Sequence, residues 1–397
     1  MKFIVAQIGS RHHYAIPRML VRADCLEALY TDACASRGLG RVCDTVLPSR
    51  LRPGSVKTLL QRRIQDVPRD KVRCTDRLLL GNFFGQSRKL DAFTAQVRAG
   101  SVFSQAMLGW GFGQATGVYS MFGEGLEFLR AAKARGLRIV VDVFITPVAH
   151  RIISAERAAF PAWEGGEAGW DERLETRIRE ILELADMLLC PGQNVVEGVR
   201  AFGESLVGKT RVVPYGSGTN FAGKRNEPTI GRVLFGGTAE LRKGIHYFAA
   251  AARQLLDRGV RAEFLVAGNV ADRIRSLPEC AALKFLGRIP RDQMQEELLR
   301  ADVLVLPTLA EGSASVITEA LVAGLPVITT QSAGALVVHG ENGLIIPERG
   351  ISALAEAISS VIEDRGARNH LADGARQSSS QFSESAWADR LVQALTS

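Results

Sequence analysis

Short apolar runs alternate with amphipathic stretches along the whole chain, which is the pattern of a parallel α/β protein. In the second half, the apolar runs predict strands at Val233–Phe235, Glu263–Ala267, Lys284–Leu286, Val303–Leu306, Val327–Thr329 and Leu344–Ile346. Apolar positions at helical spacing predict helices at Ile245–Leu256, Gln293–Leu299, Ser315–Ala323, Ile351–Ile362 and Glu384–Leu395. Unbroken apolar strands are expected where helices cover both faces of a sheet.

The first half shows the same alternation. Its apolar runs predict strands at Lys2–Ile8, Ser101–Phe103, Leu137–Ile145, Met187–Cys190 and Arg211–Pro214. Helices are expected at Ile16–Leu29, Leu126–Arg135 and Leu174–Leu184. Residues 215–228 are rich in Gly, Asn and Lys, which indicates a linker between two α/β units.

The length of 397 residues is too great for one hydrophobic core and suits two. The fold class is therefore α/β, with two Rossmann-like α/β/α domains. We expect the first domain at residues 1–212, the second at residues 213–380, and a last helix at residues 381–397 that packs back toward the first domain.

The composition indicates the cellular compartment in which the protein is expected to work. No apolar run approaches the roughly 20 residues that cross a bilayer, and the N-terminus lacks the pattern of a signal peptide. The six cysteines are scattered and contain no C-x2-C pair, so we expect reduced thiols rather than a zinc site or a disulfide framework. A cytoplasmic protein follows as the expectation, with peripheral attachment to the inner face of the plasma membrane left open.

The excess of positive over negative charge lies entirely in the first half. Residues 1–212 carry 30 Lys and Arg against 22 Asp and Glu, a net of +8, whereas residues 213–397 carry 19 against 20, a net of −1. Residues 49–77 alone hold nine Lys and Arg and three Asp, with Val56, Leu59, Leu60 and Ile64 on one helical face. This pattern fits a basic amphipathic helix on an anionic membrane surface, or a helix that faces the core with a charged back. A nucleic-acid partner is not expected.

The most informative loop follows the strand Val303–Leu306. Ligands of open α/β sheets bind beyond the carboxyl ends of the strands, and a helix N-terminus beside a glycine suits a diphosphate. Here Gly312 precedes a helix that starts near Ser315, and Glu311 and Glu319 flank that start. Carboxylates accept hydrogen bonds from vicinal hydroxyls. Two polyols on one diphosphate describe a nucleotide sugar.

The sequence Glu311-x7-Glu319, followed by Gly324-Leu-Pro326, closely resembles the signature of retaining GT-B glycosyltransferases of glycosyltransferase family 4. The resemblance is strongest from Arg232 to Pro347 and implies a cleft between the two domains. It implies that Glu319 holds the ribose hydroxyls and that Glu311 contacts the transferred sugar. The backbone that would hold the sugar and the phosphates is then Gly312, Ser313, Ala314 and Ser315.

Leu241-Arg-Lys243-Gly also resembles the family, whose Arg and Lys clamp the donor diphosphate. Lys243 matches the Lys, but Gly237 stands where the family's Arg is usual. Arg242 is a candidate substitute, and weaker donor binding is the alternative. In the loop 286–290, Arg288 and Ile289 would lie at the edge of the donor base.

The first domain is expected to hold the acceptor. Gly9, Ser10, His12 and His13 follow the first strand, where the family keeps a loop near the donor phosphate. Either histidine is a candidate base or acceptor contact, or else a polar loop residue without a role. His150 follows the strand Leu137–Ile145 and is a candidate for the family's sugar-contacting histidine.

The resemblance implies transfer of a hexosyl-type sugar from a nucleotide-diphosphate donor, with UDP or GDP expected, to a glycan or lipid-linked acceptor in surface polysaccharide or glycolipid synthesis. The anomeric configuration would be retained. No cofactor is expected, and no metal, since the chain has no Asp-x-Asp. The alternatives are a non-catalytic nucleotide-sugar-binding or scaffold subunit, and a GT-B nucleotide-sugar epimerase or phosphorylase. A dehydrogenase is disfavoured because no G-x-G-x-x-G follows Lys2–Ile8.

Overall fold

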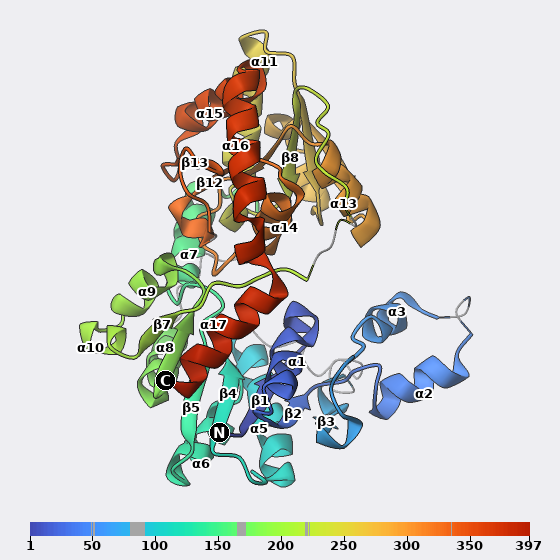
Figure 1. The fold of residues 1–397 in the computed structure, drawn as a ribbon, viewed down its shortest axis with the longest axis vertical. Coiled ribbons are helices and arrows are strands. Elements are labelled where there is room, and N and C mark those ends of the chain that lie inside the picture. The colour runs from blue at the N-terminus through green and yellow to red at the C-terminus, as the bar shows by residue number, and fades with distance from the viewer. Residues whose placement is uncertain are drawn as a thin grey trace.

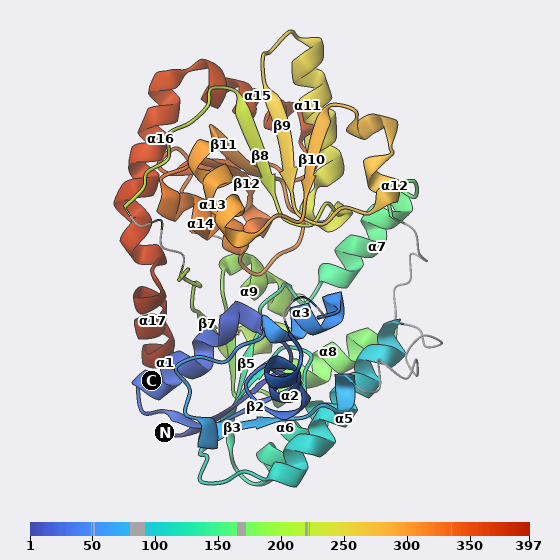
Figure 2. The same ribbon diagram turned by 90° about the vertical axis from the view of Figure 1, so that its right-hand side faces the viewer.

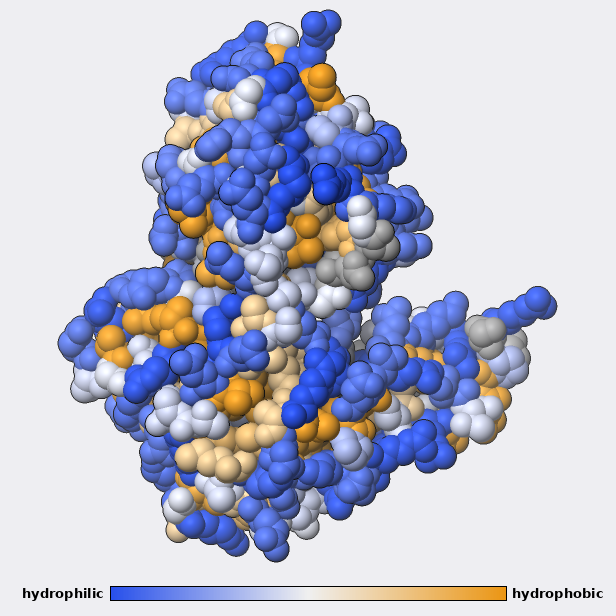
Figure 3. All heavy atoms as spheres, in the orientation of Figure 1, coloured by the Kyte–Doolittle hydropathy of each residue, from blue (hydrophilic) through white to orange (hydrophobic). Residues whose placement is uncertain are grey.

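The computed structural model describes residues 1–48, 50, 52–79, 92–164, 172–218, 221, 223–334 and 336–397. Two α/β domains lie one above the other in Figure 1, the first coloured blue to green and the second mostly yellow to red. Each domain is built on its own parallel sheet, and the surface narrows to a waist where the domains meet (Figure 3).

The first domain contains a seven-stranded sheet in the order β3-β2-β1-β4-β5-β6-β7, with parallel neighbours throughout. The strands are β1 (Phe3–Gln7), β2 (Leu26–Thr31), β3 (Val72–Cys74), β4 (Gly117–Met121), β5 (Arg138–Asp142), β6 (Met187–Cys190) and β7 (Thr210–Val212). The strand order reverses between β1 and β4, so the loops after these two strands diverge and leave room for a ligand between them.

Helices cover both faces of this sheet. They are α1 (Ala15–Arg22), α2 (Gly38–Val46), α3 (Gly54–Leu60), α5 (Ala92–Trp110), α6 (Leu126–Ala134), α7 (Ala149–Ala159), α8 (Glu172–Leu184), α9 (Gln193–Arg200) and α10 (Glu204–Val207). α2 and α3 stand out as an arm on the right of Figure 1, beyond the edge strand β3. None of the described helices is both long and apolar enough to cross a bilayer.

The second domain contains a six-stranded parallel sheet in the order β10-β9-β8-β11-β12-β13. The strands are β8 (Arg232–Gly236), β9 (Glu263–Ala267), β10 (Leu283–Gly287), β11 (Val303–Leu306), β12 (Val327–Thr330) and β13 (Gly343–Ile346). The order reverses between β8 and β11, which places the loops after these strands at the usual ligand position of such a sheet.

The helices of the second domain close its core and return the chain to the first. They are α11 (Ile245–Asp257), α12 (Asp272–Arg275), α13 (Arg291–Arg300), α14 (Ser315–Ala323), α15 (Ile351–Glu363), α16 (Arg365–Ser378) and α17 (Glu384–Thr396). α17 lies against the first domain in both ribbon views (Figures 1 and 2), with Trp387, Leu391 and Leu395 buried beside residues of β1. The Arg138 guanidinium of β5 donates to the carbonyl of Leu395 at 2.9 Å.

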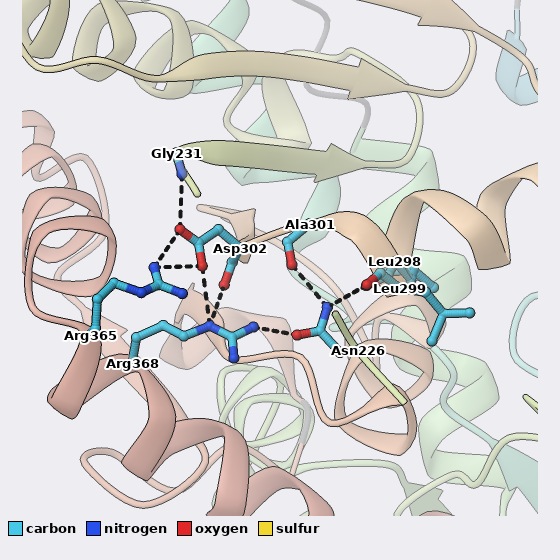
Figure 4. A network of polar contacts seen from close by, with 8 residues as sticks. All are labelled: Asn226, Gly231, Leu298, Leu299, Ala301, Asp302, Arg365 and Arg368. Carbon is cyan, nitrogen blue, oxygen red and sulfur yellow. Dashed lines mark hydrogen bonds and ion pairs between the residues drawn. The ribbon is translucent and has the colours of Figure 1, made fainter. Parts of the chain in front are cut away.

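A buried polar network fastens the segment between the domains (Figure 4). The Asp302 carboxylate is fully buried and pairs with Arg365 at 2.7 Å and with Arg368 at 3.2 Å. It also accepts from the Gly231 amide at 2.9 Å. Asn226 donates to the carbonyls of α13, including that of Leu298 at 3.0 Å. The network therefore joins the approach to β8 with the start of β11 and with α16.

The strands and helices predicted in the second half are confirmed within two residues at each end, although α12 and α16 were not predicted. Two predictions in the first half are wrong. Ser101–Phe103 lies inside α5, where Phe103 and Met107 are buried one helical turn apart. The predicted helix Ile16–Leu29 ends at Arg22, because Asp24 has a left-handed backbone, with φ at +51°, and the strand β2 follows.

The helix expected within residues 49–77 is present but short. α3 spans only Gly54–Leu60, and Val72–Cys74 forms a strand. Leu59 and Leu60 are buried within the protein, so these two apolar residues are not available to a membrane. Residues 49 and 51, and residues 219, 220 and 222 of the predicted linker, lie outside the described residues.

Candidate functional site

The loop between β11 and α14 reaches the first domain. Gly312 forms an isolated antiparallel bridge with Ile145, which follows β5. A Cβ atom on Gly312 would lie 1.8 Å from the carbonyl oxygen of Phe144, a distance that no side chain could occupy. Glycine at this position therefore lets the backbones of the two domains touch directly beside Glu311.

Glu311 brings together the basic pair expected from the sequence. Its Oε1 atom lies 2.8 Å from Nζ of Lys243 and 2.9 Å from Nη1 of Arg242, and all three side chains are less than 20% exposed. Neither contact has the angles of a hydrogen bond, so Oε1 has no hydrogen-bond donor among the described residues. The carboxylate is thus held mainly by charge, and it can accept a hydrogen bond from a ligand.

Several bonds fasten the turn that carries Lys243 to the loop after β11. This turn is a 3-10 helix, Leu241–Lys243, which follows β8. The carbonyl of Arg242 accepts from the Leu309 amide at 2.8 Å and from the Thr308 hydroxyl at 3.0 Å. Arg242 also donates from Nη1 to the carbonyl of Ala310 at 2.8 Å. The two loops of the strand-order reversal therefore form one unit.

Gly237 lies next to the side chain of Lys243. Its φ is +133°, a conformation that side chains rarely adopt, and a Cβ atom there would be 3.2 Å from Nζ of Lys243. A long basic side chain at this position would crowd Lys243. The backbone conformation at position 237 thus suits glycine rather than the arginine that the resemblance leads one to expect. The second cation beside Glu311 is Arg242.

The other predicted donor residues lie at the same edge of the sheet. Glu319 is half-buried on the second turn of α14, and Ala314 and Ser315 form the start of that helix. Arg288 is exposed and Ile289 half-buried directly after β10. Because the strands are parallel, the loops after β8, β10 and β11 all open at one end of the sheet.

The predicted loop of the first domain is held by two carboxylates that the sequence did not reveal. The Gly9 amide donates to Asp32 at 2.8 Å, and the Ile8 amide donates to Glu124 at 2.7 Å. Asp32 follows β2 and also pairs with Arg62 at 2.7 Å, while Glu124 follows β4. The loop with Gly9 and Ser10 is therefore anchored from both neighbouring strands.

Glu124 is a buried carboxyl with a shifted pKa. Burial raises the pKa of its carboxyl to about 8, although the charge of Arg11 and the Ile8 amide act against this. Arg11 lies 3.5 Å from Glu124 and stacks on the ring of Phe144, 3.7 Å from its centre. Since Phe144 also contacts the Gly312 loop, these groups link the first-domain loop to the interdomain contact.

Both histidines of the first-domain loop, His12 and His13, have a lowered pKa. Both have a left-handed backbone, with φ at +47° and +51°. His12 meets the rings of Tyr215 and Trp387 edge-on, and burial lowers its pKa to about 4. Burial and the charge of Arg291, which belongs to the second domain, lower the pKa of His13. A base with a pKa near 4 accepts a proton weakly at neutral pH.

His150 is held by two contacts within the first domain. Its Nε2 atom lies 2.6 Å from Oε1 of Glu175 on α8, and its Nδ1 atom lies 3.1 Å from the carbonyl of Pro147. Arg151 binds the same carboxylate of Glu175. Both ring nitrogens of His150 are thus engaged, and contact with a sugar requires the ring to leave Glu175.

Polar side chains of the first domain also hold the second. Asn194 of α9 donates to the backbone carbonyl of Glu311 at 2.8 Å. Figure 2 shows α7 running up from the first domain toward α12 of the second. On α7, buried Glu156 accepts from Tyr247 at 2.9 Å and pairs with Arg349 at 2.6 Å. Beyond the helix, Glu164 accepts from the Leu241 amide at 2.6 Å, so the Lys243 turn is fixed from both domains.

Part of the chain matches a family of known proteins. Residues 220–378 match the family described as Glycosyl transferases group 1. The chain is 30% identical over 165 residues to glycogen synthase of Mycobacterium tuberculosis, an alignment that covers 40% of each protein. It is 26% identical over 243 residues to D-inositol 3-phosphate glycosyltransferase of Corynebacterium urealyticum, covering 54% of this chain and 57% of that one.

Solved structures resemble the whole chain. Sucrose-phosphate synthase of Thermosynechococcus elongatus superposes with a TM-score of 0.66 at 18% identity, covering 100% of this chain and 98% of that one. HepE of Anabaena, in complex with UDP and glucose, superposes with a TM-score of 0.63 at 17% identity, covering 100% and 99%. The chain therefore has the GT-B glycosyltransferase fold, and its residues 220–378 match the family of glycosyl transferases group 1.

Proposed function

We propose that the protein is a retaining glycosyltransferase that moves a hexosyl-type sugar from a nucleotide-diphosphate donor to a hydroxyl group of an acceptor. The observation that carries the proposal is the convergence of Lys243 and Arg242 on Glu311, at the start of α14, within the part that matches the glycosyl transferases group 1. Partly buried cations beside a helix N-terminus suit a diphosphate, and a carboxylate beside them suits a sugar.

The donor diphosphate would take the place that Glu311 now holds beside the two cations. Lys243 and Arg242 carry two positive charges, and the N-terminus of α14 adds a partial positive charge. Phosphate oxygens would attract these groups more strongly than one carboxylate because they carry more charge. Released from Lys243, Glu311 could accept hydrogen bonds from the hydroxyls of the transferred sugar, while Glu319 would hold the ribose.

Charge on the departing diphosphate would be stabilised by the same groups. As the bond between the anomeric carbon and the phosphate oxygen breaks, negative charge builds on that oxygen, and Lys243 and Arg242 lie where they can stabilise it. We therefore propose that transfer needs no divalent metal. With the acceptor on the side of the leaving phosphate, that phosphate could take the hydroxyl proton, and the configuration would be retained.

The acceptor would bind to the first domain, beside the loop with Gly9 and Ser10. Arg11, which follows this loop, stacks on Phe144, and the Phe144–Ile145 segment adjoins the Gly312 loop, so an acceptor there would approach the donor sugar. The relatives include a glycogen synthase, a D-inositol 3-phosphate glycosyltransferase and a glycosyltransferase of capsular polysaccharide biosynthesis, which supports a role in polysaccharide or glycolipid synthesis. HepE was solved with UDP and glucose, so UDP-glucose is the first donor to test.

Consumption of the donor tests the proposal. The full chain would be incubated with UDP and GDP sugars and candidate glycan and lipid-linked acceptors, with EDTA present, and the products followed by proton NMR. We expect acceptor-dependent release of the nucleotide and an axial product linkage from an axial donor. Nucleotide binding without turnover would indicate a non-catalytic binding subunit instead. Conversion of the donor sugar without any acceptor would indicate an epimerase.

A further inference from the structure

A cavity lies in the first domain, beside α2. Its volume is about 410 Å³, and it is bounded by the residues after β2, by α2 and by the segment that leads to β3. Four arginines and two aspartates line it: Arg37, Arg41, Arg63, Arg69, Asp44 and Asp66. We call it the arginine pocket.

The arginine pocket has more positive charge than its own carboxylates neutralise. Asp44 is already shared, at 2.7 Å from Arg63 and 3.3 Å from Arg52. Arg37 donates to the carbonyl of Arg69, which offers no charge. Among the described residues, no carboxylate pairs with Arg41 or with the side chain of Arg69. Guanidinium groups that have no carboxylate partner at a concave surface are suited to a phosphate-type anion, which they bind with paired hydrogen bonds.

The pocket is connected to the loop that we assign to the acceptor. Arg63 lines the pocket, and its neighbour Arg62 pairs with Asp32, which in turn accepts from the Gly9 amide. One peptide bond, one ion pair and one hydrogen bond thus connect Arg63 of the pocket to the Gly9 loop. A ligand bound in the pocket would lie in the first domain, apart from the cations that face Glu311 in the second.

We propose that the arginine pocket binds a phosphate-type anion, as a site separate from the donor diphosphate. The assignment of this anion to the acceptor rests on the proposed function, whereas the binding of the anion does not. Two sources fit the chemistry, a soluble phosphate ester and the headgroup of a lipid.

An apolar stripe on α2, beside the pocket, is the reason to test a lipid headgroup separately from a soluble phosphate ester. On α2, the side chains of Leu39, Val42 and Val46 are 39%, 57% and 68% exposed. They recur at three- and four-residue intervals, so they share one face of the helix. Figure 3 shows apolar atoms among hydrophilic ones on the arm formed by α2 and α3. An apolar chain attached to the phosphate could lie along that face.

The experiment measures binding of inorganic phosphate and of glycerol phosphate by calorimetry, without nucleotide. It uses the full chain with Lys243→Ala, so that anion binding at the donor site is reduced. The same protein is then sedimented with vesicles of pure phosphatidylcholine and with vesicles of equal parts phosphatidylcholine and phosphatidylglycerol. The double variant Arg41→Ser, Arg69→Ser removes the two unpaired guanidiniums, and both residues are exposed, so folding should persist.

The matched control is Arg211→Ser, an exposed arginine on β7 at the opposite edge of the same sheet. We expect the double variant to weaken phosphate binding by about tenfold or more, as for one lost charge-assisted hydrogen bond, with the control unchanged. The same pattern seen only with anionic vesicles would support the site and identify a lipid headgroup as the source. Binding to neither probe, or equal binding by the double variant and the control, would overturn the proposal. Nucleotide binding is measured separately, so its failure would not be mistaken for failure of this pocket.

Discussion

Lys243 and Glu311 form an ion pair of 2.8 Å between the loops that follow β8 and β11, at the point where the strand order of the second sheet reverses. The pair places a cation expected to bind a diphosphate against a carboxylate expected to bind a sugar. Under the proposed function, a donor diphosphate would compete with Glu311 for Lys243. A contact between Lys243 and the phosphate would then replace the ion pair, and this exchange predicts how variants of Glu311 behave.

Substitution of Glu311 should separate nucleotide binding from sugar transfer. In Glu311→Gln, Lys243 and Arg242 no longer have to leave a carboxylate, so UDP should bind about fivefold more tightly, the value of a partly exposed ion pair of about 1 kcal/mol. Turnover should fall about 100-fold or more, because the sugar loses a charged acceptor. Calorimetry with UDP and steady-state kinetics give the two values.

The control is Glu240→Gln, which removes a carboxylate that pairs with Arg242 at 2.5 Å but leaves Lys243 and Glu311 in contact. Its UDP affinity and turnover should stay near those of the wild type. Weaker UDP binding in Glu311→Gln than in this control would show that Glu311 does not compete with the diphosphate.

Gly312→Ala should uncouple the domains. The new Cβ atom would lie 1.8 Å from the carbonyl oxygen of Phe144, and a backbone clash cannot be relieved by a side-chain rotation. We expect a larger radius of gyration in X-ray scattering and a loss of turnover of about 100-fold, with UDP still bound by the second domain. Gly109→Ala, which has open space around it, is the control. Full activity in Gly312→Ala would mean that the contact is not used.

Glu124 should make stability depend on pH in a particular direction. Its pKa is raised to about 8, so the folded protein keeps a proton that the unfolded chain loses near its ordinary pKa. This contribution to stability is complete at low pH and is lost as the pH rises toward 8. Between pH 6.5 and 8, the free energy of unfolding of the wild type should fall relative to Glu124→Gln by about 2 kcal/mol.

That window avoids the buried histidine His246, whose pKa is lowered to about 4 and whose effect lies between pH 4 and 6.5 with the opposite sign. Urea unfolding at several pH values measures the difference. Parallel curves for the wild type and Glu124→Gln would show that Glu124 is ionised in the folded protein at neutral pH.

Asp302→Ala should destabilise the protein by about 3–5 kcal/mol, because it leaves the Arg368 guanidinium buried without its anion. Asp373→Ala is the matched control, since Asp373 lies on the same helix as Arg368 but is 59% exposed beside Arg376. Denaturant unfolding measures both. If Asp302→Ala lowers the free energy of unfolding by less than about 1 kcal/mol, the ion pairs of Asp302 contribute little to stability.

The second domain could be predicted from the sequence because its signals are local. The run Val303–Leu306 is purely apolar, and the glycine and serines after it lead into the helix α14. In the first domain, β2 contains Leu, Glu and Ala, which favour helices, and it comes shortly after the helix α1. The two elements were therefore predicted as one helix. Its strand conformation comes from pairing with β1, a contact that no local pattern encodes.

Asp32 and Glu124 were not predicted as site residues because β2 and β4 were not predicted as strands. Asp32 and Glu124 follow β2 and β4, and carboxylates after parallel strands are candidates for a site once the strands are known. The sequence did indicate Lys243 and Glu311 separately. It could not indicate that they touch, or that Asn194 of the first domain binds the backbone of Glu311, because these contacts depend on how the two sheets are placed.

The central claim is that the second domain binds a nucleotide-diphosphate sugar through Glu319 and the cations beside Glu311. Thermal unfolding with UDP, GDP, ADP, dTDP and their sugars, for the wild type, Glu319→Ala and Glu356→Ala, tests it most directly. Glu356 is an exposed glutamate of α15 and serves as the control. Ligand at about 100 times its dissociation constant should stabilise the wild type and the control by roughly 2.7 kcal/mol. The account predicts a shift with one base that is lost in Glu319→Ala. No shift with any nucleotide, or an equal shift in all three proteins, would contradict it.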